Sequence, residues 1–276
     1  MQPHEHGQEV KQILRSRGVS VRLINQLKRT PNGMIINGEK VVRTVDICAA
    51  GDTILLSIPS DEKPLPALAY DLDILYEDSD IVVVNKPAGL PIHPSRLHQG
   101  NTLANAIAAR YGVTFRAAGR LDKGTSGIVV VCLHCFAAAK LNANVKKTYT
   151  ALVHGEYHGT GTFNHTIYRP TISTVRACRD YSDAREPGDE TAITHWQAQE
   201  YNAGVTRLRI NLETGRTHQI RVHFAHQGTP LVGDDYYGAP NWDKPGHALH
   251  CGEARFTHPV TEKWMEFACA PPWDVL

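Results

Sequence analysis

The sequence predicts an α+β protein made of a small module and a larger, strand-rich domain. Apolar runs flank Asn37-Gly38, and two more flank an acidic turn at residues 77–80; both patterns are typical of β-hairpins. Helical patterns with polar N-caps, as at Thr102, alternate with the strands. A Pro-rich segment at residues 59–66 is typical of a semi-extended linker, and it separates the two parts.

Length and composition suit this division. The 276 residues are 42% hydrophobic and 21% charged, enough for one large core plus a small module. We expect the module at residues 8–59, a linker at 60–69 and the main domain at 70–276. No apolar run approaches the roughly 20 residues of a membrane helix, and residues 1–6 lack the apolar core of a signal peptide. We therefore expect a cytoplasmic monomer with no membrane contact.

The six cysteines are expected to be reduced thiols. Cys132-Leu133-His134-Cys135 has the spacing of half a structural zinc site, but no second Cys pair or His pair stands at a suitable distance in the sequence. In the alternative interpretation, Cys132 ends a strand and Cys135 begins a helix, and both pack as small hydrophobic residues. We expect this alternative and no metal site.

Charge is unevenly distributed along the chain. The net charge is +1, yet residues 8–58 hold eight basic and four acidic residues, a net +4, which leaves −3 for the rest. A compact basic segment favours an anionic polymer as partner, although a solvated basic helix face gives the same pattern.

The order of elements in this segment narrows the class of anionic partner. It predicts a helix that starts near Val10 and stops at Gly18, a second helix capped by Ser20, and then the hairpin around Asn37-Gly38. This order resembles the small RNA-binding module first seen in a small-subunit ribosomal protein. The basic residues expected to contact RNA are Arg15, Arg17, Arg22, Lys28 and Arg29.

The main domain is expected to begin with a hairpin at residues 72–86, which Lys86-Pro87 ends abruptly. The loop that follows would present Lys86 and His93, although either residue alone is better explained as structural. A helix capped at Thr102 and running to Tyr111 comes next.

Asp122 lies in the stretch around which the domain is organised. Residues 119–127 combine an Arg-Leu-Asp step with small turn-forming residues and lead into the β-branched run at 128–131. The pattern predicts a loop that delivers one carboxylate to the mouth of a buried strand. An equal alternative is an Asp side chain that hydrogen-bonds the backbone of Thr125 or Ser126 within a turn.

The remaining elements are mostly strands. We expect a helix at 136–145, a strand at 146–155 that carries Tyr149, strands at 192–199 and 205–212, and a polar surface excursion at 156–190.

A second dense stretch, residues 212–228, predicts a helix of about three turns with an exposed N-terminus and a glycine stop. An unpaired Arg221 packed against the core would be costly. We therefore expect Arg221 to meet a carboxylate, with Asp122 as the candidate; the alternative is an Arg221 that faces solvent.

Five motifs in this order resemble the RluA-type pseudouridine synthases: residues 85–94, residues 120–127, Lys147-Thr148-Tyr149, residues 215–223 and residues 249–261. The resemblance spans about residues 70–272. It implies a domain built on a large mixed, mainly antiparallel sheet with flanking helices and a central cleft. It also implies an isomerase that breaks the N-glycosidic bond of an RNA uridine, rotates the uracil and rejoins it through carbon five, without a cofactor.

The resemblance implies roles for individual residues. Asp122 would be the catalytic carboxylate, kept ionised by Arg221. Tyr149 would stack on the base and serve in proton removal from carbon five, for which a phenol with a reference pKa of about 10 is a poor base. Ile220 would pack against the uracil, and Arg120 would occupy the space left by the flipped-out nucleotide. Lys86 and His93 are further candidate substrate contacts.

Two glycines depart from the family pattern. Many relatives have His where Gly119 stands and a larger polar residue where Gly124 stands, so we expect a looser loop here.

The basic module slightly favours ribosomal RNA over transfer RNA as substrate. One alternative is a catalytically silent RNA-binding protein. Another is a glycosidase, which needs a second catalytic carboxylate at a defined separation; no second acidic motif stands out in the sequence.

Overall fold

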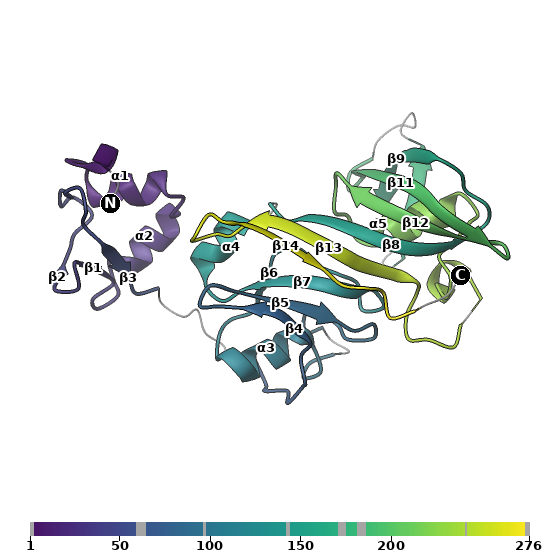
Figure 1. The fold of residues 1–276 in the computed structure, drawn as a ribbon, viewed down its shortest axis with the longest axis horizontal. Coiled ribbons are helices and arrows are strands. Elements are labelled where there is room, and N and C mark those ends of the chain that lie inside the picture. The colour runs from purple at the N-terminus through teal and green to yellow at the C-terminus, as the bar shows by residue number, and fades with distance from the viewer. Residues whose placement is uncertain are drawn as a thin grey trace.

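The computed structural model describes residues 3–58, 65–95, 98–141, 144–170, 175–180, 186–240 and 242–273. The fold is α+β, with a small three-stranded sheet near the N-terminus and a mixed eleven-stranded sheet in the rest of the chain (Figure 1). Within the described ranges, no helix is both long enough and apolar enough to span a bilayer.

The N-terminal part follows the predicted order. Its elements are a short 3-10 helix η1 (Pro3–Glu5), α1 (Val10–Ser16), α2 (Val21–Leu27), β1 (Met34–Ile36), β2 (Lys40–Val41) and β3 (Ile54–Leu56). The Ser20 side chain accepts a hydrogen bond from the Leu23 backbone at 3.1 Å and caps α2, as expected. Asn37 and Gly38 both have positive φ, which is the conformation of the predicted hairpin turn.

The hydrophobic core of this part continues into the rest of the chain. Its buried residues come from α1, α2 and the small sheet, and Cys135 and Phe136 of helix α4 (Cys135–Leu141) pack against them. Figure 1 shows the N-terminal elements beside α4. A small cavity of about 160 Å³ between Arg22 and Phe136 marks the same contact.

The large sheet has the strand order β10-β9-β11-β12-β8-β13-β7-β5-β4, with β14 paired to β13 and β6 paired to β7. All of its strand pairs are antiparallel except β13 with β7. Its strands are β4 (Ile74–Glu77), β5 (Ile81–Lys86), β6 (Arg116–Ala117), β7 (Ser126–Cys132), β8 (Lys146–His154), β9 (Thr160–Tyr168), β10 (Ala177–Asp180), β11 (Glu190–Asn202), β12 (Val205–Leu212), β13 (Leu249–Thr257) and β14 (Trp264–Ala268).

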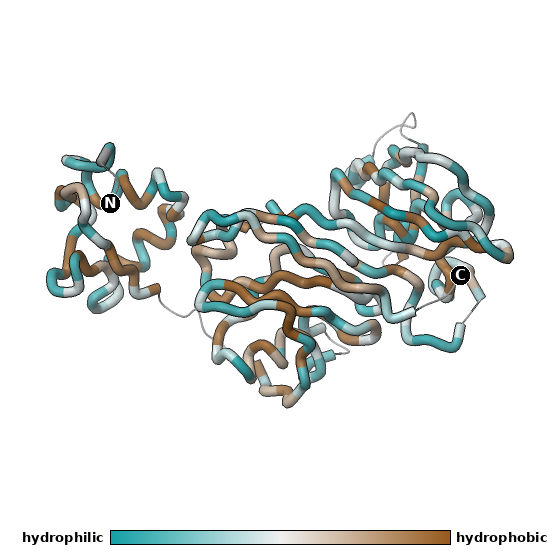
Figure 2. The backbone as a smooth tube through the Cα atoms, in the orientation of Figure 1, coloured by the Kyte–Doolittle hydropathy of each residue, from teal (hydrophilic) through white to brown (hydrophobic). Residues whose placement is uncertain are grey.

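Strands β5 and β7 lie at the centre of the main core. Residues 81–84 and 126–132 are buried on both faces of the sheet, and Figure 2 shows these strands as a hydrophobic band. Helix α3 (Leu103–Tyr111) is capped by Thr102, as expected, and ends at Gly112 in the left-handed conformation. The expected end of β7 at Cys132 and the expected start of α4 at Cys135 are also confirmed.

The expected surface excursion at residues 156–190 is wrong for most of its described length. Strands β9 and β10 lie within it and extend the sheet, and β11 begins at its last residue. Along residues 160–165 of β9 exposed residues alternate with partly buried ones, because helix α5 (Gln219–His226) covers one face and solvent the other; Thr166 and Ile167 at its end are both buried. The exposed Thr and Asn side chains gave the segment its polar, loop-like composition. Residues 171–174 and 181–185 of this stretch lie outside the described ranges.

Helix α5 is shorter than predicted because it begins at Gln219 rather than near Gly215. His218 immediately before it has φ 59°, which breaks the helical path. The buried Gln219 side chain holds the preceding loop, accepting hydrogen bonds from the Arg216 backbone at 3.0 Å and the Thr214 hydroxyl at 2.9 Å.

Candidate active site

A cleft of about 1210 Å³ opens where three segments meet. They are the loop at residues 117–123 that leads to β7, the start of β8 with Tyr149, and the loop at 211–217 that leads to α5. His93 and Arg176 complete its wall. The cleft thus joins motifs that are more than 100 residues apart in the sequence.

Asp122 lies in this cleft with its carboxylate available. Its backbone carbonyl, not its side chain, accepts the turn hydrogen bond from Thr125 at 3.1 Å. The side chain is 26% exposed, and its Oδ2 accepts a hydrogen bond from Arg221 Nη1 at 3.2 Å. The turn-residue interpretation of the side chain is therefore wrong, and the expected contact between Asp122 and Arg221 is confirmed.

Arg221 has a second and tighter partner, Asp234, which the sequence did not reveal. Arg221 Nε and Nη2 each lie 2.8 Å from one oxygen of the Asp234 carboxylate, which is 1% exposed. Burial alone lowers the pKa of Arg221, but the hydrogen bonds and charge of Asp234 and the charge of Asp122 raise it overall. Asp234 follows Gly233 in an acidic pair with Asp235, but Asp235 is exposed and the pair itself does not signal which of the two is buried.

His218 completes the surroundings of Asp122. Its Nε2 lies 3.8 Å from Asp122 Oδ2, and its Nδ1 lies 2.9 Å from the Tyr237 hydroxyl. Burial lowers the pKa of His218 despite the nearby Asp122 charge, so a neutral imidazole faces the carboxylate at neutral pH. The left-handed backbone at His218 turns this ring into the site at the start of α5.

Strand β13 and the segment before it anchor the Asp122 loop. Thr125 Oγ1 lies 2.9 Å from His247 Nε2, and Ser126 Oγ lies 2.8 Å from His250 Nδ1. Gly127 has φ 108°, and a Cβ there would come within 2.3 Å of the Cys251 carbonyl oxygen. The chain therefore requires glycine at the point where the loop enters β7.

Lys86 is buried, contrary to the prediction that the loop after β5 presents it. Its side chain is only 1% exposed, so the loop does not present it to solvent. Its Nζ donates hydrogen bonds to the carbonyls of Pro87 at 2.8 Å, Leu90 at 3.0 Å and Lys123 at 3.4 Å. Burial lowers its pKa to about 7, an effect opposed by the Asp122 charge. Lys86 joins the loop after β5 to the Asp122 loop, which is the structural alternative that the sequence left open.

The expectation of a loose loop is wrong at Gly124. A Cβ at this position would lie 2.8 Å from the His247 ring and 3.3 Å from the Gly246 Cα. The space that a larger residue would fill is thus occupied by His247, which is itself buried. Gly119 has φ 86°, and a Cβ there would lie 3.1 Å from Lys147 Nζ in the cleft wall.

Tyr149 and Ile220 occupy different surroundings. Tyr149 on β8 lines the cleft while being 7% exposed. Burial, together with the nearby Cys251 and Asp122, raises the pKa of Tyr149 well above 10, so its hydroxyl is protonated at neutral pH. Ile220 is 4% exposed in the main core and is absent from the described residues that line the cleft. Almost none of the Ile220 side chain is therefore exposed for the expected contact with uracil in this conformation.

Arg120 and His93 face the cleft from its rim. Both side chains are exposed and line the cleft. The His93 ring packs edge-on against Phe115 at 4.8 Å, and desolvation followed by the Arg120 charge lowers the pKa of His93. Two polar groups thus border the entrance above Asp122.

The basic residues of the N-terminal part divide into two groups. Arg15, Arg22, Lys28 and Arg29 are exposed and have no ion-pair partner within the ranges that the structure describes. Arg17 differs, because its Nε and Nη2 each lie 2.8 Å from an oxygen of the buried Glu5. Its guanidinium is engaged within the fold, although its side chain is 49% exposed, so its expected contact with RNA stays a prediction.

Comparisons with known proteins agree with this geometry. Residues 80–226 match the family model described as RNA pseudouridylate synthase. The chain is 36% identical over 279 residues to the uncharacterized RNA pseudouridine synthase YjbO of Bacillus subtilis (strain 168), covering 96% of each chain. It is 33% identical to the ribosomal large subunit pseudouridine synthase D of Haemophilus influenzae, covering 92% of this chain and 80% of that one.

A solved structure also matches. Human RNA pseudouridylate synthase domain containing 1 shares 28% identity and a TM-score of 0.59, covering 73% of this chain and 84% of that one. The chain belongs to the RluA-type family of RNA pseudouridine synthases, which are intramolecular isomerases.

Proposed function

We propose that this pseudouridine synthase modifies uridine in ribosomal RNA and that Asp122 is its catalytic carboxylate. The observation that carries the proposal is the position of Asp122 in the cleft: it is partly exposed, bonded through Oδ2 to Arg221, and leaves Oδ1 without a hydrogen bond to any described residue. A carboxylate in this state can attack or stabilise an electron-poor sugar carbon, or take a proton from it.

The ion pair with Arg221 supports this role. A guanidinium hydrogen bond favours the ionised carboxylate and fixes its orientation. Asp234 in turn holds Arg221 through Nε and Nη2, and the contact of Arg221 with Asp122 is made by Nη1. Asp234 is 1% exposed and cannot reach a substrate. The other carboxylate among the described cleft residues is Glu213, which pairs with His195 at 2.7 Å.

The rim and wall of the cleft suit a flipped nucleotide. The cleft volume of about 1210 Å³ exceeds that of most small-ligand pockets, as a segment of polymer requires. We assign Arg120 to the space that the nucleotide vacates in the RNA and the Tyr149 ring to the face of the uracil. The raised pKa of Tyr149 means that it does not act as a resting phenolate base.

The N-terminal part supports a structured RNA as substrate. We assign residues 8–59 as an RNA-binding module, 60–69 as linker and 70–276 as the catalytic domain. Arg15, Arg22, Lys28 and Arg29 are exposed there for phosphate contacts. Ribosomal RNA is favoured because relatives 33–34% identical are ribosomal large subunit pseudouridine synthases.

Pseudouridine mapping tests the substrate. Total RNA from cells with and without the protein is labelled and sequenced, and ribosomal and transfer RNA are scored separately. We expect one or more pseudouridines of ribosomal RNA to disappear and to return on complementation. Loss confined to transfer RNA would overturn the substrate, and no loss in any RNA would favour the catalytically silent alternative.

A further inference from the structure

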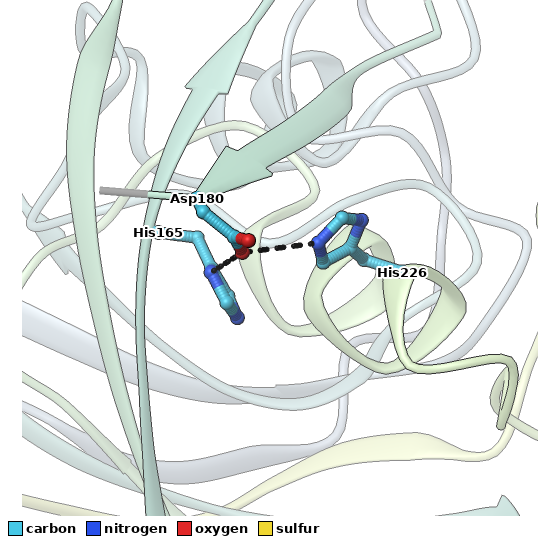
Figure 3. Close-up of side chains that lie close together, drawn as sticks. All are labelled: His165, Asp180 and His226. Carbon is cyan, nitrogen blue, oxygen red and sulfur yellow. Dashed lines mark ion pairs between the residues drawn. The ribbon is translucent and has the colours of Figure 1, made fainter. Parts of the chain in front are cut away.

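Three side chains converge at the C-terminal end of α5 (Figure 3). His165 lies on β9, Asp180 ends β10, and His226 ends α5. Asp180 Oδ1 lies 3.5 Å from His165 Nδ1 and 3.7 Å from His226 Nε2. One ligand atom from each residue lies within 4.8 Å of the others.

Two ring nitrogens in and beside this cluster are buried without a hydrogen-bond partner among the described residues, whereas His165 Nε2 lies 3.4 Å from Gln227 Nε2. His165 Nδ1, the atom nearest Asp180, is buried and has no hydrogen-bond partner. His223, one turn before His226, is 0% exposed; its Nδ1 lies 2.9 Å from Thr194 Oγ1, but its Nε2 is buried and unpartnered. The rings of His223 and His226 lie 5.4 and 5.0 Å from the His165 ring. Unsatisfied buried nitrogens are rare in native proteins and require an explanation.

A second cluster in the chain shows the contrasting case. Asp78, Asp80 and His258 are equally close together, but their polar atoms are paired. Asp78 binds the His258 ring at 2.9 Å and accepts hydrogen bonds from the Tyr76 hydroxyl and two backbone amides, while Asp80 binds His134 at 2.8 Å. That cluster is satisfied by the protein itself, whereas the cluster at His165 is not.

We propose that His165, Asp180 and His226 form a zinc-binding site, with His165 Nδ1, Asp180 Oδ1 and His226 Nε2 as ligands. Imidazole and carboxylate are ordinary Zn²⁺ ligands, at about 2.0–2.2 Å. In a tetrahedral site of that radius, neighbouring ligand atoms are about 3.3 Å apart, close to the 3.5 and 3.7 Å observed. Small side-chain movements would bring the three atoms to coordination distance, and a water would take the fourth position.

The bound ion would join two strands to the helix that carries Arg221. His165 and Asp180 come from β9 and β10, at the edge of the sheet, and His226 comes from α5. The site is independent of the Asp122 chemistry, because none of its ligands lines the cleft. It departs from the expectation of no metal, which considered only the cysteines at 132 and 135.

Metal binding by the full chain tests the site. The protein is stripped with a chelator and dialysed against ZnCl₂, and bound zinc is measured by elemental mass spectrometry. Asp180→Asn and His226→Asn each remove one ligand from an exposed or partly exposed position, so folding is preserved. His158→Asn is the matched control, because His158 is an exposed histidine that pairs with Glu156 outside the cluster.

We expect one zinc ion per wild-type chain and per His158→Asn chain, and affinity at least about 10-fold weaker in the two ligand variants, since even outer-shell changes cost 10- to 100-fold. Zinc should also raise the Tm of wild type and control but not of the ligand variants. Co²⁺ substitution should give d–d bands without thiolate charge transfer, which separates this site from the six cysteines. Substoichiometric zinc in wild type, equal affinity in all variants, or a thiolate band would overturn the proposal.

Discussion

Asp234 holds Arg221 through two hydrogen bonds of 2.8 Å, whereas the contact of Arg221 with Asp122 is a single bond of 3.2 Å. The guanidinium is therefore positioned from behind by a buried carboxylate, and it presents one N–H to the carboxylate in the cleft. This arrangement makes Asp234 a positioning residue for the site, although it touches no cleft surface.

Asp234→Asn should impair both stability and catalysis. The change leaves Arg221 with an amide in place of a buried anion, and breaking one partner of a buried ion pair costs roughly 3–5 kcal/mol. The free energy of unfolding should fall by about 3 kcal/mol, and a misplaced Arg221 should lower kcat on the order of 10- to 100-fold. Asp235→Asn is the matched control, since Asp235 is the exposed neighbour. Equal kcat in the two variants would contradict a positioning role.

Gly124 and His247 should be energetically coupled. Gly124→Ala places a methyl group 2.8 Å from the buried His247 ring, which forces the ring or the loop to move. We expect Gly124→Ala to destabilise the protein, and to do so less in a His247→Ala background, with a coupling of about 0.5–3 kcal/mol. Urea unfolding of wild type, the two single variants and the double variant measures this coupling energy. Gly100→Ala, where a Cβ meets open space, is the control, and additive effects at 124 and 247 would contradict the account.

His250 should make stability depend on pH. Its Nε2 lies 3.1 Å from the Cys269 carbonyl, which only a donor can satisfy, so in the neutral ring Nδ1 accepts from the Ser126 hydroxyl. Burial lowers the pKa of His250 in the folded state. Below pH 6.5 the unfolded chain therefore takes up a proton that the folded chain does not, and the free energy of unfolding falls by up to about 1.4 kcal/mol per pH unit.

Urea unfolding at pH 7.5 and 5.5 measures how much the free energy of unfolding falls because of His250. In His250→Asn the amide oxygen replaces the Nδ1 acceptor and cannot titrate, so stability should fall less between the two pH values than in wild type. His158→Asn, at an exposed histidine, should behave as wild type. An unchanged pH dependence in His250→Asn would contradict a neutral, buried imidazole.

Some of the N-terminal basic residues should affect RNA binding, and Arg17 should affect stability. Lys28→Gln with Arg29→Gln removes two exposed charges, so RNA binding should weaken and the slope of log K against log salt should fall by about 1.4–1.8. Arg17→Gln should instead lower stability, because Arg17 is bonded to the buried Glu5. Filter binding across a salt series measures the slope, and urea unfolding measures the stability of Arg17→Gln. An unchanged slope in the double variant would count against an RNA-binding role.

Local signals in the sequence predicted much of the fold. Caps at Ser20 and Thr102, the Asn37-Gly38 turn and the apolar run of β7 determine structure through nearby residues, and each was found where expected. Strand β9 was missed because its first six residues are covered on one face only, and their exposed side chains resemble those of a loop. That cover comes from α5, more than 50 residues later, which local composition does not report.

The candidate active site was likewise predicted only in part. The pairing of Asp122 with Arg221 was predictable because a buried arginine needs a carboxylate. The stronger partner Asp234 was not, since nothing local distinguishes its burial from the exposure of Asp235. Lys86 was misplaced for a related reason: its three carbonyl partners come from two loops that meet only in the folded chain.

Asp122→Asn tests directly whether the Asp122 carboxylate carries out the isomerisation. The amide keeps the size of the side chain but cannot act as a nucleophile or base. Pseudouridine formation is measured in ribosomal RNA from cells complemented with either protein, alongside RNA binding of the purified proteins. We predict that Asp122→Asn abolishes modification while RNA affinity stays within about twofold to threefold of wild type, because the phosphate contacts are elsewhere. Full modification by Asp122→Asn would contradict the account.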